Sequence, residues 1–145
     1  MKGANFHPHL TGSEFVRAKR KTATRVKQVA LSTLRNKLDR VFSEFIRRRD
    51  ADSNGMGKCV TCNQYRLLQC GHFIKRQHHA VRWDERNAAG QCMPCNHFRG
   101  GNEGEFYHAL LKKYGQWTMN LLMSLKHKTV KFSREQLQEM IERFK

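Results

Sequence analysis

The sequence predicts an α+β protein that is mostly helical, with a small zinc-stapled core flanked by helices. Three observations lead to this fold class. Two C-x-x-C pairs enclose a segment with short strand-like stretches. Long segments on either side place apolar residues at three- and four-residue steps, the spacing of an amphipathic helix. The length of 145 residues suits one domain with a modest core.

We expect this single domain to have four parts along the chain: a flexible arm (1–15), a long basic helix (22–50), a zinc-bound core (57–102) and a helical packing layer (103–145). The helical pattern runs from about Thr24 to Arg49, and turn residues at 50–55 end it. Its apolar stripe comprises Val26, Ala30, Leu34, Leu38, Val41, Phe42 and Phe45. Basic residues fall mostly off the stripe, so that face either follows a phosphate backbone or is simply solvated.

Within the core, two short stretches are predicted to be the strands of a hairpin, Tyr65–Leu68 and Phe73–Lys75. The segment Gln91–Phe98 is predicted to run from a cysteine turn into a helix. These elements are too small to be held by apolar burial alone, so the core depends on its cysteines.

The cysteines form two pairs, Cys59/Cys62 and Cys92/Cys95. Two C-x-x-C turns bring four thiolates to one point, which is the tetrahedral set that Zn²⁺ prefers. With all four positions taken by cysteine, the zinc has no open position and is predicted to be structural. Disulfides are the alternative, but they need an oxidising compartment, and the first ten residues lack a signal-peptide core. We therefore expect a cytoplasmic protein with reduced cysteines.

The packing layer is predicted from apolar stripes. One helix should contain Phe106 and Leu110 and stop at Gly115. The next stretch, Trp117–Leu125, is apolar enough to be a buried helix. Ser133 and the Gln three residues later form a capping box that begins the last helix.

The formal net charge of +16 predicts a polyanionic partner, and nucleic acid is the commonest one. A membrane surface is the alternative. Basic helices that bind membranes carry more Trp and Phe on their opposite face, however, and no apolar run here approaches the length of a membrane span. DNA is therefore the expected partner, and a membrane is not.

Three polar residues lie in order within the core: His72, Asn87 and Asn96. Their order and spacing resemble the HNH or ββα-metal nucleases. In that family a β-hairpin carries a His base, a loop carries an Asn, and a short helix carries a metal-binding Asn or His. The resemblance implies that residues 57–102 form an HNH-like ββα-metal core with these three as catalytic residues.

Phosphodiester hydrolysis needs a proton acceptor and a positive charge on the phosphate. His72, with an ordinary pKa of ~6.5, is the candidate base. Asn96 offers one oxygen to a hard cation, Mg²⁺ or Mn²⁺. Asn87 is expected to clamp the loop by hydrogen bonds. The alternative for His72 is a hydrogen-bonded histidine of the core.

Many HNH enzymes place an Asp or His directly before the catalytic His, where this chain has Gly71. Asp84 and His79 are the nearby alternatives for a second metal ligand. Cys70 is expected to be a small buried residue, because a soft thiolate suits Mg²⁺ poorly.

Five basic residues are predicted to surround the site and hold flanking phosphates, which gives affinity without base reading. They are Lys75, Arg76, Arg82, Arg86 and Arg99. Asp84 and Glu85 could instead pair with some of them.

Between about Lys58 and Gly115 the motifs G-H-F, R-W-D-E-R-N, Q-C-M-P-C-N and G-N look like the NinG (Rap) family of lambdoid phages. This resemblance implies a metal-dependent endodeoxyribonuclease that acts on branched recombination intermediates, such as Holliday junctions and D-loops, in a bacterial host cell. Resolving a junction takes two symmetric nicks, which is compatible with a two-fold homodimer.

Two other classes of function fit parts of the pattern. One is a non-catalytic, zinc-stabilised module that binds nucleic acid through charge. The other is a protein-interaction or assembly module whose basicity is incidental. Replacing His72 by Ala separates the nuclease from the binding module, and the salt dependence of DNA affinity tests the third class.

Overall fold

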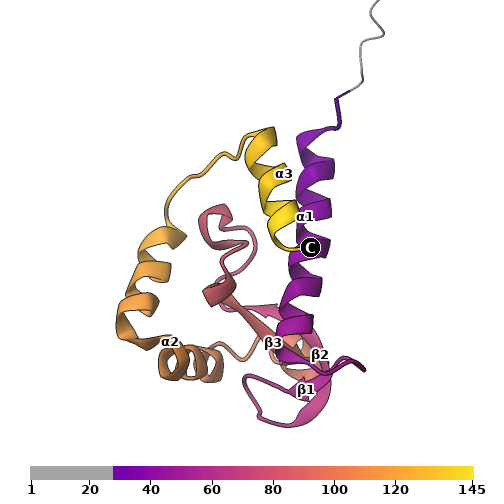
Figure 1. Ribbon diagram of the computed structural model, residues 1–145. Coiled ribbons are helices and arrows are strands. Elements are labelled where there is room, and N and C mark those ends of the chain that lie inside the picture. The colour runs from indigo at the N-terminus through magenta and orange to yellow at the C-terminus, as the bar shows by residue number, and fades with distance from the viewer. Residues whose placement is uncertain (1–27) are drawn as a thin grey trace, which may run out of the picture.

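The structure is a computed structural model that describes residues 28–145. The predicted arm (1–15) and the start of the predicted basic helix (22–27) lie outside the described residues. Helices cover a small three-stranded antiparallel sheet, which confirms the α+β, mostly helical class (Figure 1). The elements are α1 (Leu31–Asp50), β1 (Met56–Lys58), β2 (Tyr65–His72), the 3-10 turns η2 (His79–Val81) and η3 (Glu85–Asn87), β3 (Ala88–Cys92), the π-helical turn η4 (Pro94–Phe98), α2 (Glu103–Lys126) and α3 (Arg134–Arg143).

The sheet has the order β1-β2-β3. The second half of β2 pairs with β3 in the register Leu68↔Cys92 to His72↔Ala88, whereas β1 pairs only with residues 65–67. Within the described residues, positions 69–72 of β2 therefore have a strand on one side only. The prediction of a strand at Phe73–Lys75 is wrong, because the Asn87 side chain binds the backbone of this segment and holds it in a loop.

Helix α1 begins at Leu31 rather than near Thr24, and Ala30 is exposed at its N-terminal boundary. Its buried stripe repeats every four residues, through Leu34, Leu38, Phe42 and Ile46. This stripe packs against α3, against Trp83 of the long loop and against the sheet. Figure 1 shows α1 and α3 side by side, with the sheet at the lower end of α1.

Helix α2 breaks at Gly115, where φ is 79° and ψ is 166°. This left-handed φ favours glycine, so the predicted stop is confirmed as a kink after which the helix resumes. The second half is not buried all round: Met119 and Leu122 are in the core, but Trp117 is 71% exposed. One face packs toward the loop between β2 and β3, and the other faces solvent.

Helix α3 begins with the predicted capping box. The Ser133 hydroxyl accepts a hydrogen bond from the backbone N–H of Gln136, and the Gln136 side chain accepts one from the backbone N–H of Ser133. Leu137, Ile141 and Phe144 are buried against α1. Across residues 28–145, none of the helices combines the length and the apolar character that crossing a bilayer requires.

Candidate metal centre and active-site cleft

The four paired cysteines meet at one point between two turns. Their sulfur atoms all lie within 4.8 Å of one another, and Cys62 Sγ is 3.7 Å from Cys92 Sγ. A zinc ion with Zn–S bonds of about 2.3 Å has its sulfurs roughly 3.8 Å apart, so the spacing fits a tetrahedral site. All five cysteines of the chain are free thiols in the structure, and no disulfide joins any of them. These cysteines can therefore hold a structural zinc ion.

The hydrogen bonds around the sulfurs also suit a metal-bound thiolate. The backbone N–H of Cys92 donates to Cys59 Sγ at 3.3 Å. Burial raises the pKa of the Cys59 thiol, but backbone hydrogen bonds from Cys62 and Cys92 outweigh this and lower the pKa to about 6. Negative charge is thus favoured on this sulfur, whereas burial raises the pKa of Cys62 and raises that of Cys92 to about 12.

Among the predicted catalytic residues, His72 and Asn96 line one cleft, with a volume of about 470 Å³. The cleft runs along the unpaired side of β2, between α1 and η4. Its full lining is Ser43, Arg47, Gln69, Cys70, His72, Lys75, Arg76, Asn96, His97, Gly100, Gly101 and Glu103.

The His72 ring is held in one orientation. Its Nε2 lies 2.9 Å from the carbonyl oxygen of Arg82, which can only accept, so Nε2–H is the donor. Nδ1 is then left with the lone pair, and its near neighbour is Cys70 Sγ at 4.0 Å. The ring packs beside Phe42 and is half-buried at the cleft wall. The geometry leaves the unprotonated nitrogen available as a proton acceptor.

Burial, together with the positive charges of Arg76 and Arg82, lowers the pKa of His72 to about 4, although the hydrogen bond to the Arg82 carbonyl and the charge of Asp39 oppose this shift. The imidazole is therefore neutral throughout the physiological range. An ordinary pKa of ~6.5 is expected for His72 from the sequence, and burial of the ring makes that expectation wrong. Burial likewise raises the pKa of Cys70 to about 12, so this cleft residue remains a neutral thiol.

Asn87 is completely buried and acts as a clamp. Its Oδ1 accepts from the Ile74 backbone N–H at 2.8 Å, and its Nδ2 donates to the carbonyls of Ile74 and Val81, both at 2.9 Å. With no exposed surface, it cannot contact a substrate. It is a positioning residue that fixes the loop carrying the Arg82 carbonyl.

Asn96 stands on η4 and faces β2. Its Nδ2 donates to Gln69 Oε1 at 3.0 Å, which leaves its own Oδ1 free of that contact. Glu103 supplies a carboxylate to the same cleft, and Lys75 pairs with it at 3.8 Å. Within residues 28–145, the four cysteines are the only group of three or more His, Cys, Asp or Glu side chains that lie close enough together to hold a metal ion. The oxygen donors that Asn96 and Glu103 bring to the cleft are of the kind that a hard cation prefers, but they do not form a group of three ligands.

The position before His72 has no room for a further ligand. A Cβ at Gly71 would come within 2.5 Å of Gln91 Oε1 and 3.0 Å of Gln91 Cβ. The alternatives considered from the sequence do not fill the gap: Asp84 and His79 line a different cleft, beside α3. That separation follows from the path of the loop, which carries both away from β2.

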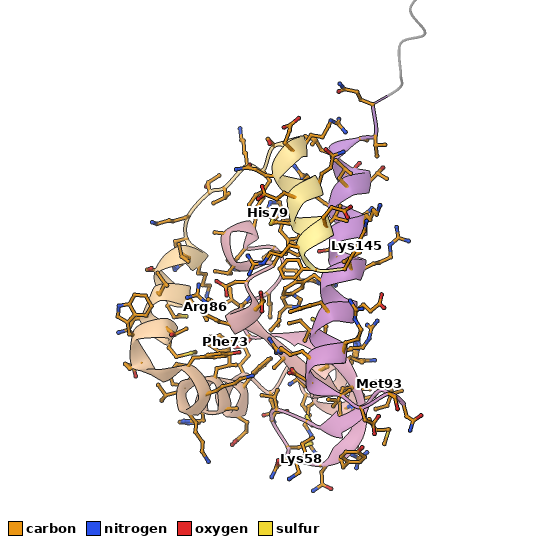
Figure 2. All side chains as sticks on the ribbon, viewed as in Figure 1. Lys58, Phe73, His79, Arg86, Met93 and Lys145 are labelled. Carbon is orange, nitrogen blue, oxygen red and sulfur yellow. The ribbon has the colours of Figure 1, made fainter. Side chains whose placement is uncertain are left out.

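The five predicted phosphate-binding residues divide into three groups. Lys75 and Arg76 line the cleft, and Arg99 lines a hollow over the cysteine centre. Arg82 and Arg86 are not in the cleft, because each is committed to an ion pair, Arg82 with Asp39 and Arg86 with Asp84. Figure 2 shows His79 and Arg86 on the loop that joins β2 to β3.

Two important residues escaped the sequence reasoning. Arg47 belongs to the cleft but stands on α1 among other basic residues, and nothing local singles it out. Asp39 accepts hydrogen bonds from the side chains of Arg82 and Trp83 and so ties the loop to α1. Burial raises the Asp39 pKa, but these bonds and the Arg82 charge outweigh it and keep the pKa below its ordinary value. One of only three acidic residues in a basic helix, Asp39 was the available signal.

The fold and its four-cysteine centre define a small α+β protein with a group of cysteines that could hold a metal ion. The family described as Bacteriophage Lambda NinG protein matches residues 13–145. The chain belongs to this family. Comparison with curated proteins and with solved structures gave no match.

Proposed function

We propose that the protein is a metal-dependent endodeoxyribonuclease of the HNH type that cuts branched recombination intermediates such as Holliday junctions and D-loops. The observation that carries this proposal is the shared cleft, in which His72 has an unprotonated ring nitrogen beside the Cys70 thiol and Asn96 has an amide oxygen. Membership of a phage family supports a role connected with phage recombination. The site would be built on β2, the loop and η4, in the manner of a ββα-metal core.

His72 would act as the general base. Its Nδ1 would accept the proton of an attacking water, and the Arg82 carbonyl, bonded to Nε2–H, would stabilise the resulting imidazolium. Asn96 and Glu103 would hold Mg²⁺ or Mn²⁺, which when bound offsets charge on the phosphate and on the leaving oxygen. Asn87 and Asp39 would act indirectly, because their hydrogen bonds fix the loop that carries the Arg82 carbonyl.

Charge around the cleft supports a phosphate backbone as the substrate. Arg47, Lys75 and Arg76 line it, and across the chain 28 Lys and Arg face 12 Asp and Glu. Phosphate contacts position DNA but do not read its sequence. Selection by DNA shape therefore fits this surface better than selection by base sequence.

The test is a Mg²⁺-dependent cleavage assay on linear, flap and four-way DNA of matched sequence. His72→Ala should lose cleavage by at least about 10²-fold, the usual contribution of a general base, while DNA binding and fold persist. The exposed His108→Ala is the matched control. A binding module would cut in neither form, and equal cutting of linear and four-way DNA would remove the structure-selective part of the proposal.

A further inference from the structure

The π-helical turn η4 separates two hollows. On one side Asn96 and His97 line the cleft described above. On the other side lies a hollow of about 280 Å³ over the cysteine centre, where Arg66 and Arg99 reach the surface. Phe98 lines neither hollow and stands between them along the turn.

Phe98 is 77% exposed, more than the other large apolar side chains that are exposed in the described part of the chain. It belongs to none of the core clusters, so the fold does not explain an aromatic ring there. A lone exposed apolar residue is ordinary, but this one lies two positions after Asn96. π-turns are rare and occur frequently at functional sites.

A second exposed apolar side chain, that of Met93, stands at the start of the same turn. Arg99 N–H donates to the Pro94 carbonyl at 3.1 Å, the five-residue step of a π-turn. Met93 precedes Phe98 by this same step, which places both on one side of the turn, and Met93 is 49% exposed. In Figure 2 Met93 projects from the side of the molecule that is opposite α2.

The electrostatics of this side allow a polyanion to approach. Four thiolates around Zn²⁺ leave two negative charges, which Arg66 and Arg99 are placed to offset. No Asp or Glu lines the hollow itself. A DNA strand that leaves the cleft across η4 would thus meet an aromatic face with basic groups beyond it.

We infer that Phe98, supported by Met93, is a stacking platform for unpaired DNA bases next to the cleft. Every base has a π-face, so such a platform selects opened over paired DNA without reading sequence. Apolar side chains also serve as wedges at opened base steps. The inference rests on the proposed function, because it supplies the residue through which that cleft would favour branched substrates.

The test measures binding in the His72→Ala background, where no cleavage is needed. The probes are two flap DNAs of equal length and charge, one with normal unpaired nucleotides and one with abasic sites in their place. We expect the normal flap to bind more tightly by roughly 5- to 150-fold, which corresponds to ~1–3 kcal/mol of stacking. Phe98→Ala should abolish this difference, and Phe98→Tyr should retain it.

Trp117→Ala is the matched control, since this aromatic ring is 71% exposed on α2 and should not affect the difference. Equal binding of the two flaps by the parent protein, or a difference that persists in Phe98→Ala, overturns the inference. The inference is also overturned if sedimentation shows that Phe98→Ala dissociates a dimer, because the Phe98 ring would then pack against a second copy of the chain. Failure of the wild type to cut any DNA would refute the proposed nuclease, while the binding comparison would still decide the role of Phe98.

Discussion

Replacing Asn87 by Ala tests the clamp that holds the loop between β2 and β3. The substitution removes three buried hydrogen bonds, two to the backbone of Ile74 and one to the carbonyl of Val81. The Ile74 N–H loses its acceptor in a region from which water is excluded. The loop should therefore lose the anchor that places the Arg82 carbonyl against His72.

The size of the effect follows from these bonds. Each contributes a net stabilisation of about 0.5–1.5 kcal/mol, and an unsatisfied buried polar group costs about 1–3 kcal/mol. We expect the free energy of unfolding to fall by roughly 2–5 kcal/mol, out of the ~5–15 kcal/mol usual for a domain. Cleavage activity, if the proposed function holds, should fall as well, because the carbonyl that orients His72 moves with the loop.

The measurement is urea unfolding followed by circular dichroism in zinc-containing buffer. Asn120→Ala is the control, because it removes the same kind of side chain from the exposed surface of α2. The Asn120 side chain bonds only to Gln116, at 2.8 Å, so its loss should change the free energy of unfolding by less than about 0.5 kcal/mol. A loss below about 1 kcal/mol for Asn87→Ala would refute the clamp. An Asn87→Ala protein of unchanged stability that has lost only cleavage would instead indicate direct contact with substrate.

Two further predictions concern the metal centre and His72. Removing zinc with excess chelator should unfold the sheet region, because structural zinc supplies roughly 10–16 kcal/mol of apparent binding energy. Adding zinc back should restore the fold. An unchanged thermal midpoint in protein shown by elemental analysis to be metal-free would contradict this prediction. Burial holds the His72 pKa near 4, below the unfolded value of ~6.5, so the unfolded chain binds the extra proton between these values. The stability contributed by the neutral ring should be complete above about pH 6.5 and decline toward pH 4. His72→Asn should remove this part of the pH dependence when the free energy of unfolding is measured from pH 4.5 to 7.5. Equal slopes of the free energy of unfolding against pH in the two proteins would show that His72 titrates normally.

Local sequence determined the features whose partners are close along the chain. Each C-x-x-C turn pairs its own two sulfurs, and the Ser133 capping box and the Gly115 break are complete within a few residues. The stripe of α1 was predicted in the same way, apart from its start and from Ile46 at its end. The family resemblance pointed to His72, Asn87 and Asn96, and the structure places His72 and Asn96 in one cleft.

The second strand of the hairpin was misplaced because a distant contact decides it. Residues 73–75 are apolar enough for a strand, but the Asn87 side chain takes up the backbone groups of Ile74, and the chain pairs β2 with residues 88–92 instead. A hydrogen bond across thirteen positions leaves no periodic mark in the sequence.

By itself, then, the sequence determined the four cysteines that could hold a metal, the helical class and the basic character of this protein, since each depends on residue type and short spacing. Only the tertiary structure decided which charged groups are available to a ligand. Arg82 and Arg76 look alike in the sequence, yet Asp39 on α1 occupies the first and leaves the second at the cleft. Burial, which no local pattern reports, likewise set the pKa of His72.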